Sequence, residues 1–490
     1  MNPHIRLGML LVLCHYSFLS IAQRPSSPAV DFLTGDQIHR DLDSLEAWIL
    51  RIHPSPFVHC SSVDFEQACL NSRETFEGGG SLFAEAQMVA RICNTLKDSH
   101  TGLSLRSFSN QLGETYGHLP LEIKTVRNQL RISRTYGDSN SMGQEVVAVN
   151  GVPARSILGS SLPLVSQEGD AKVARLRVAE KLWNDIAPFV TGSKIGDEVT
   201  VQLNNGQSFE LLVQTNEEMQ ELQRQSAKAI HWTEMVDEAN NGTSIHLKIG
   251  HFHPENLRLF RRELQRCFRA VKDLSEQNQN FKGLVLDLRG NSGGHISIMA
   301  ELLPYLISEA VRIPYGVQIK VSETAKNQLL KRRRGWFLRK EKYDKNLQNL
   351  NEQLGQLPLD TIAFVPFSVP ITPDGRLNYN GPVALIMDGL SASASVSIAS
   401  WFVRSGRGMT FGEPPMGSIS GTFGNPVQIK LPESGLLVNI ASARYFTQNP
   451  MQWVSLPLLP DFPVIPDAEQ VLRNIDAPRN RALEWLNDID

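Results

Sequence analysis

The sequence lacks features that distinguish several classes of protein, such as a high cysteine content or an excess of basic residues. It contains five cysteines in 490 residues, too few for a fold that disulfides hold together. Lysine and arginine number 48 against 51 aspartate and glutamate residues, a formal net charge of -3, so the basic excess typical of nucleic-acid-binding proteins is missing. Ordinary contents of hydrophobic (41%) and charged (20%) residues over this length predict a folded chain of several domains.

Long hydrophobic runs are also missing, and the one apolar segment near the N-terminus is short. It runs from Leu7 to Ala22, after a start that carries Arg6. The segment falls short of the about 20 apolar residues of a spanning helix, and the small residues Ser20 and Ala22 fit a signal-peptidase site. We expect residues 1–22 to be a signal peptide and the protein to be periplasmic or secreted, without a later membrane span. A membrane anchor is the alternative.

Apolar periodicity divides the first half of the mature chain into two parts. Apolar residues recur at helical spacing between residues 34 and 96, which predicts an N-terminal helical region over 23–112. Short strand-like segments follow, separated by turn signals such as Asn150-Gly151. They predict a β-rich module with a helical insertion over 113–216.

Residues 217–490 alternate strand and helix patterns. Two nearly all-apolar segments, Leu284–Leu288 and Val383–Met387, are typical of strands buried on both faces of a sheet. A polar insertion at about 318–358 contains the basic run Lys331–Arg334. A solvated surface helix explains that run better than an anionic partner, because the whole chain is balanced in charge. The fold class is therefore α/β with several domains.

Each apolar strand is followed by a tight turn and a predicted helix start. The first turn, Asp287–Gly294, contains three glycines, which let a ligand approach backbone N–H groups at a helix N-terminus. It lacks the Lys-Ser/Thr ending of a phosphate-binding loop, so a developing oxyanion fits it better. The second turn, Asp388–Ser395, contains Ser-Ala-Ser-Ala-Ser and presents a serine as a nucleophile elbow would. A plain turn and close helix packing are the alternatives.

Four motifs follow one another along the chain. Lys97–Thr101 (Lys-Asp-Ser-His-Thr) comes first, the two turns follow, and Gly412–Gly417 (Gly-Glu-Pro-Pro-Met-Gly) comes last. Taken in this order, they resemble the motifs of the carboxyl-terminal processing (tail-specific) and tricorn-type serine peptidases. The resemblance covers essentially the whole mature chain and is closer to the tricorn-like branch. It implies a crotonase-like (ββα) catalytic core in 217–490, a PDZ-like module in 113–216, and hydrolysis of peptide bonds.

Matched to the family's pattern, Ser393 is the nucleophile. The backbone N–H groups of Ala394 and of Gly293 or Gly294 form the oxyanion hole. The processing branch carries its catalytic lysine just after the Gly-Glu-Pro motif, where this chain has Ser418. The resemblance therefore excludes a Ser–Lys dyad at this position.

The tricorn branch uses a histidine base preceded by a serine, and His100 and Ser99 reproduce that pair. A histidine, with a free pKa near 6.5, is also well suited to act as a general base. The glutamate of that branch has no counterpart in residues 453–458. The residue that orients His100 is thus left open among Ser99, Asp98 and Glu413, and a purely structural role for His100 is the alternative.

The sequence as a whole predicts an exported serine peptidase that acts on peptides or unfolded proteins without a cofactor. His251 and His253 could share one face of a strand, but no third ligand accompanies them, and we expect no metal site. A non-catalytic peptide or ligand binder on the same fold is the main alternative. A crotonase-type acyl-CoA enzyme is disfavoured by the signal peptide. The cleavage site and the oligomeric state are left open.

Overall fold

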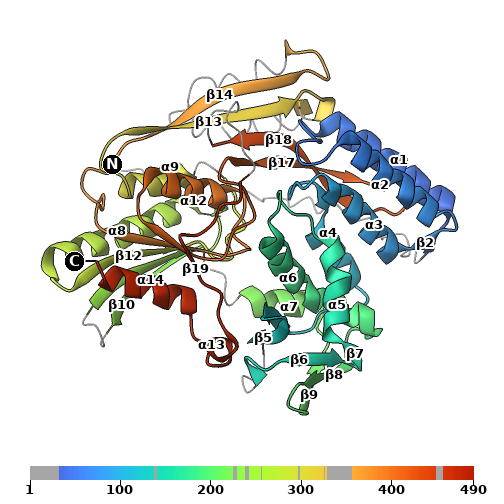
Figure 1. Ribbon diagram of the computed structural model, residues 1–490, viewed down its shortest axis with the longest axis horizontal. Helices are drawn as coiled ribbons and strands as arrows, with labels where there is room; N and C mark the ends of the chain where they lie inside the picture. The colour runs from blue at the N-terminus through green and yellow to red at the C-terminus, as the bar shows by residue number, and fades with distance from the viewer. Residues whose placement is uncertain are drawn as a thin grey trace, which may run out of the picture.

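Figure 1 shows a computed structural model of the chain. It describes residues 32–136, 141–224, 229–237, 242–254, 256–295, 298–324, 326–327, 356–447 and 456–489. The predicted signal peptide, residues 1–22, and the basic run Lys331–Arg334 lie outside these residues. Within them, no helix combines the length and the apolar character needed to cross a bilayer.

The first described part is helical, as its periodicity predicts. Thr34 begins α1 as an N-cap, because its hydroxyl accepts the backbone N–H of Gln37 at 3.4 Å. Extended backbone at His53, directly before Pro54, ends the same helix. The elements are β1 (Phe32–Leu33), α1 (Gly35–Ile52), α2 (Ser62–Thr75), β2 (Gly80–Ser81), α3 (Leu82–Thr95), β3 (Gly102–Leu103) and α4 (Leu105–Gly113).

The middle part contains two small antiparallel sheets and one long helix. β4 pairs with β5, and the second sheet has the order β7-β6-β8-β9. At the predicted turn, Asn150 and Gly151 have φ values of 46° and 78°, as a type I′ hairpin requires. The expected helical insertion is α6. The elements are β4 (Leu121–Val126), β5 (Gln129–Thr135), β6 (Val146–Val149), β7 (Val152–Pro153), α5 (Ala154–Ser161), α6 (Lys172–Thr191), β8 (Glu198–Leu203), β9 (Ser208–Leu212) and α7 (Asn216–Arg224).

The last part is built on a six-stranded sheet of order β10-β11-β12-β15-β16-β19. Its strands run parallel except for the edge strand β10. The packing clusters put α8 and α12 on one face and α14 on the other (Figure 1). The elements are β10 (Ile230–Asp237), β11 (Gly242–Ile249), α8 (Leu257–Gln277), β12 (Phe281–Asp287), α9 (Met299–Leu302), β15 (Val383–Met387), α12 (Ala394–Ser405), β16 (Met409–Gly412), β19 (Phe462–Pro463), α13 (Ala468–Leu472) and α14 (Ala477–Asn487).

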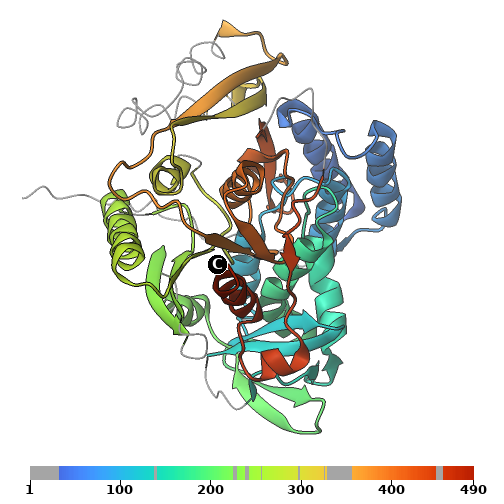
Figure 2. The ribbon, with the colours of Figure 1, turned by 60° about the vertical axis from the view of Figure 1, so that its left-hand side comes forward.

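A second sheet joins the N-terminal and C-terminal parts of the chain. Its order is β14-β13-β18-β17, and β3 pairs with β18 through Gly102–Asn439 and Leu103–Val438. The β13–β14 hairpin extends away from the rest of the molecule (Figure 2). The strands are β13 (Val311–Lys320), β14 (Ile362–Ile371), β17 (Gly421–Lys430) and β18 (Leu437–Phe446).

One hydrophobic core connects segments from three regions of the sequence. It contains Ile49 of α1, Trp183 of α6 and Ile440 of β18, each at most 1% exposed. A separate core lies between the six-stranded sheet and its helices. The helical region is thus packed against both the middle part and the second sheet, which fixes the segment that follows α3.

One boundary shifts and one local expectation is wrong. The charged insertion predicted at about 318–358 begins after Lys320, because residues up to Lys320 belong to β13, where they pair with β14. His251 and His253 do not lie on a strand, since β11 ends at Ile249 and Phe252 between them makes only an isolated bridge to Gly294.

The cysteines of the described part are free thiols. They are Cys60, Cys69, Cys93 and Cys267. Cys60 and Cys69 are close in sequence, and no disulfide joins them.

Candidate active site

Ser393 lies at the turn from β15 into α12. Its φ of 54° and ψ of -118° are strained for a non-glycine residue and cost on the order of 1–3 kcal/mol. Ser391 Oγ donates to the carbonyl of Leu288 at 2.9 Å. Ser395 Oγ donates to the carbonyl of Asn291 at 2.8 Å. Among the described contacts, the Ser393 hydroxyl alone of these three has no hydrogen bond, as expected of a serine kept available for chemistry.

The glycine turn after β12 packs directly against Ser393. The two turns meet because β12 and β15 are adjacent parallel strands. A Cβ atom at Gly293, where φ is 96°, would lie 2.7 Å from Ser393 Cβ and 2.9 Å from Ala394 N. Only glycine fits this approach. The Ala392 N–H also donates to the carbonyl of Asn291 at 3.0 Å, so the two turns form one unit.

The backbone donors beside Ser393 are not equivalent. The N–H of Gly293 donates to Asn291 Oδ1 at 2.9 Å. Within the described residues, the N–H groups of Gly294 and Ala394 have no acceptor. Ala394 is also the first residue of α12, where the helix dipole favours negative charge. Of the two glycines left open by the sequence, Gly294 therefore has the N–H available for an anion.

His100 lies in the turn between α3 and β3. Thr101 Oγ1 accepts the backbone N–H of Ala441 at 3.0 Å, so this turn is attached to β18. Asp98 Oδ1 accepts the backbone N–H of His100 at 2.7 Å. Burial lowers the pKa of His100, and the negative charge of Asp98 only partly opposes this. At neutral pH the ring is therefore neutral and able to accept a proton.

Asp98 orders the turn without hydrogen-bonding the His100 ring. Its Oδ2 accepts Thr101 Oγ1 at 2.6 Å and lies 3.1 Å from His53 Nε2. Its Oδ1 is 3.9 Å from His100 Nδ1, which is too far for a hydrogen bond. Burial raises the pKa of Asp98, but His53, His100 and Thr101 outweigh burial and lower it. Asp98 is thus a buried carboxylate that holds the backbone of the turn.

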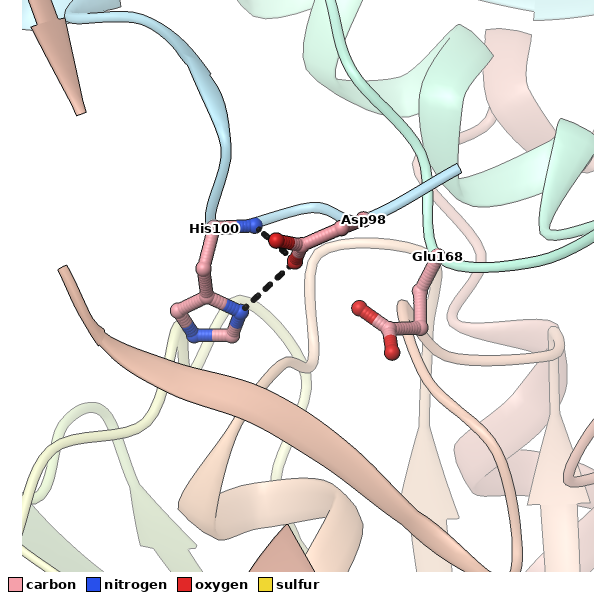
Figure 3. Close-up of side chains that lie close together, drawn as sticks. All are labelled: Asp98, His100 and Glu168. Atoms are coloured by element: carbon pink, nitrogen blue, oxygen red, sulfur yellow. Dashed lines mark hydrogen bonds and ion pairs between the residues drawn. The ribbon is translucent and has the colours of Figure 1, made fainter. Parts of the chain in front are cut away.

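The His100 ring is contacted by Ser99, and Ser99 by Glu168. Ser99 Oγ lies 3.3 Å from His100 Nδ1 and donates to Glu168 Oε2 at 2.9 Å. The Ser99 N–H reaches the same carboxylate oxygen at 3.2 Å. Figure 3 shows the carboxylate of Glu168 facing Asp98 and His100 from a separate segment. Burial and the charge of Asp98 raise the pKa of Glu168 to about 8.

Glu168 was not predicted from the sequence. It precedes α6, the predicted helical insertion, by a few residues. No motif or spacing marks it, and 69 positions separate it from Ser99. Only the packing of α6 brings it to the turn that carries His100.

Glu413, a predicted candidate for orienting His100, binds Arg177 instead. Arg177 contacts its carboxylate at 2.7 and 2.9 Å, and Lys124 Nζ lies 3.5 Å away. Burial raises the pKa of Glu413, but Arg177 and Lys124 outweigh it and lower the pKa. The candidate role is therefore wrong: the end of β16 directs this carboxylate toward α6.

The first turn of α6 connects the two halves of the site. Ala171 and Ala174 pack with Met416 and Ala392, directly before Ser393. Three positions before Ala171, Glu168 holds Ser99. One short segment thus contacts both the serine side and the histidine side of the site.

The donor atoms of Asp98, His100 and Glu168 lie within 4.8 Å of one another. Two carboxylates and an imidazole are groups that zinc accepts. The oxygens of Asp98, however, already contact Thr101, His53 and the His100 N–H. Ser99 bridges the other two side chains. We therefore treat the cluster as a hydrogen-bonded network and assign it no metal.

Comparison with known proteins identifies the domain that carries Ser393. Residues 246–464 match the sequence profile of Peptidase family S41. The chain carries a peptidase family S41 domain. This family consists of serine peptidases, which are hydrolases. The S41 domain contains both turns, whereas Ser99, His100 and Glu168 all precede the matched residues.

The chain is also similar to solved structures. Mature CPAF complexed with lactacystin matches with a TM-score of 0.62 and 12% identity, over 93% of this chain and 97% of that one. The photosystem II D1 C-terminal processing protease matches with a TM-score of 0.41 and 16% identity, over 90% of this chain and 98% of that one. The tricorn protease matches with a TM-score of 0.39 and 11% identity, over 93% of this chain and 37% of that one. No curated protein sequence matches. The CPAF match extends the shared fold beyond the S41 domain.

Proposed function

We propose that the protein is a Ser-His peptidase that hydrolyses peptide bonds in peptides or unfolded proteins. Ser393 Oγ attacks the carbonyl carbon while His100 takes the hydroxyl proton and returns it to the leaving amine. The N–H groups of Ala394 and Gly294 stabilise the oxyanion of the tetrahedral intermediate. The observation that carries the proposal is the strained backbone of Ser393, held against the Gly293 turn at a helix N-terminus.

The contacts of His100 support its role as base. Its Nδ1 faces Ser99, so Nε2 is the nitrogen left for exchanging a proton with Ser393. The partial exposure of its side chain, 18%, leaves access for a substrate. Burial keeps the imidazole neutral at physiological pH.

We further propose that residues 217–490 form a crotonase-like core and that residues 113–216 act as a PDZ-like module. Such a module binds an extended peptide by adding it as a strand to a sheet edge. Export is part of the same proposal. A mature protein whose N-terminal peptide begins at Gln23, found by mass spectrometry, would support it, and an intact Met1 terminus would contradict it.

Labelling with a fluorophosphonate probe tests the nucleophile. The probe should modify Ser393 in the wild type, and Ser393→Ala should lose both labelling and hydrolysis of an unfolded protein substrate. Ser397→Ala, one turn further along α12, is the matched control and should keep both. Labelling at another residue, or full activity of Ser393→Ala, overturns the assignment. Peptide binding without labelling of the wild type would favour the non-catalytic alternative.

A further inference from the structure

We propose that Glu168 is a positioning residue of this active site. Acting through Ser99, it fixes His100 in the tautomer that carries its proton on Nδ1, so that Nε2 can accept the proton of Ser393. This inference rests on the proposed function and adds to it the residue that orients the base.

The direction of the hydrogen bonds among Glu168, Ser99 and His100 determines which tautomer His100 adopts. An ionised carboxylate only accepts hydrogen bonds, so Ser99 Oγ must donate its single proton to Glu168 Oε2. The lone pairs of the same oxygen are then directed at His100 Nδ1, 3.3 Å away. A nitrogen that faces an acceptor carries the proton. The other ring nitrogen is thereby left as the base.

The position of Glu168 is closely fixed. The side chain is buried, with 3% exposure. The next residue, Gly169, donates its N–H to the carbonyl of Lys97 at 2.9 Å, which ties the loop to the turn of His100. Within the described residues, Glu168 Oε1 accepts no hydrogen bond of normal geometry, although the N–H of Phe423 is near enough to lower the pKa of the carboxyl. A buried carboxylate with an unsatisfied oxygen lowers stability, which is more easily understood at an active site than in a structural role.

The two hydrogen bonds that link Glu168 to Ser99 and Ser99 to His100 form a relay, and protonation of Glu168 would reverse the direction of both. A neutral carboxyl can donate to Ser99, whose hydroxyl then donates to Nδ1, and Nε2 keeps the proton.

Two other charged groups face Glu168: Asp98 raises its pKa, and Arg444 of β18 interacts with it electrostatically. The N–H groups of Ser99 and Phe423 lower its pKa, without preventing the rise to about 8. Lys97 and Asp170 pair with each other at 3.2 Å. Activity should therefore increase as the pH rises through about 8.

The first experiment replaces Glu168 by glutamine and measures kcat and KM between about pH 6 and pH 9. Glu168→Gln should lower kcat by about 10- to 100-fold and leave KM within about twofold, because the substrate contacts are intact. It should also remove the inflection near pH 8. Glu122→Gln is the matched control, since Glu122 is a carboxylate of β4 that binds Tyr136 and Lys181. It should keep the wild-type profile.

The second experiment combines Ser99→Ala with Glu168→Gln. If both act through one relay, the double variant should be about as slow as either single variant, whereas independent effects would multiply. Ser99→Ala removes no buried charge, and it serves alone if Glu168→Gln does not fold: loss of its pH inflection supports the relay. A wild-type pH profile in either variant overturns the inference. It would leave the proposed function intact as long as Ser393→Ala is inactive.

Discussion

Arg177 of α6 and Glu413 after β16 form a buried two-point ion pair, although 236 positions separate them in the chain. The Arg177 guanidinium also contacts Glu180 on the same helix at 2.8 Å. A Cβ at Gly389, in the Ser393 turn, would lie 2.7 Å from the Arg177 side chain. This pair therefore fixes α6, and with it the loop of Glu168, against the turn of the nucleophile.

Replacing Arg177 by methionine should destabilise the protein by about 3–5 kcal/mol, because the carboxylates of Glu413 and Glu180 would be left buried without it. The free energy of unfolding in urea measures this loss. Arg261→Met is the control, since Arg261 is 43% exposed in its pair with Glu301, and its loss should cost less than about 1 kcal/mol. Equal losses in the two variants would contradict the role given to the buried pair.

Gly293→Ala should abolish most activity while the protein stays folded. The added methyl would meet Ala392 O at 2.6 Å and Ser393 Cβ at 2.7 Å, so the nucleophile turn must move. We expect kcat/KM to fall by about 100-fold or more. Gly290→Ala is the control, because Gly290 has φ of 74° but nothing within 4 Å of an added Cβ. It should cost about 1 kcal/mol in stability and little activity; a smaller effect at Gly293 than at Gly290 would refute the argument.

Thr101→Val should lower both stability and activity. Its hydroxyl donates to Asp98 and accepts from the N–H of Ala441. Valine of similar shape therefore leaves the Ala441 N–H without this acceptor and removes one donor from Asp98, whose Oδ2 still lies 3.1 Å from His53 Nε2. The expected cost is about 1–3 kcal/mol by urea unfolding. Because this bond attaches the His100 turn to β18, kcat should also fall. A stable variant with unchanged kcat would show that β3 pairing alone holds the turn.

His118→Gln should change how stability depends on pH. Burial lowers the pKa of His118, but its hydrogen bond to Asp185 Oδ1 at 2.7 Å and the charge of Asp185 outweigh burial and raise it. A raised folded pKa stabilises the fold at pH values below the unfolded pKa of about 6.5. This contribution disappears as the pH rises through the folded pKa. The wild type should therefore exceed the variant in unfolding free energy by more at about pH 5 than at about pH 9. An equal difference at both pH values would contradict the shift.

The sequence by itself determined the local structure and the two turns that flank the nucleophile. The all-apolar segments became β12 and β15, and parallel neighbours place their carboxyl ends at one edge, so the glycine turn and Ser393 meet as expected. The helical insertion became α6, and Ser99 contacts His100. The strands, the helix and the two turns depend on residues close in sequence, whose periodicity and turn chemistry decide the backbone. That the two turns meet depends also on the pairing of β12 with β15, for example of Leu284 with Val383.

The tertiary structure alone decided which distant side chains meet. It gave Ser393 its positive φ, attached β3 to β18, directed Glu413 to Arg177, and brought Glu168 to Ser99. Nothing in the local sequence distinguishes the roles of Glu168 and Glu413. Glu168 binds Ser99, which contacts His100, whereas Glu413 binds an arginine, because a carboxylate's partner depends on how helices and sheets pack across the whole chain. No local pattern encodes that packing.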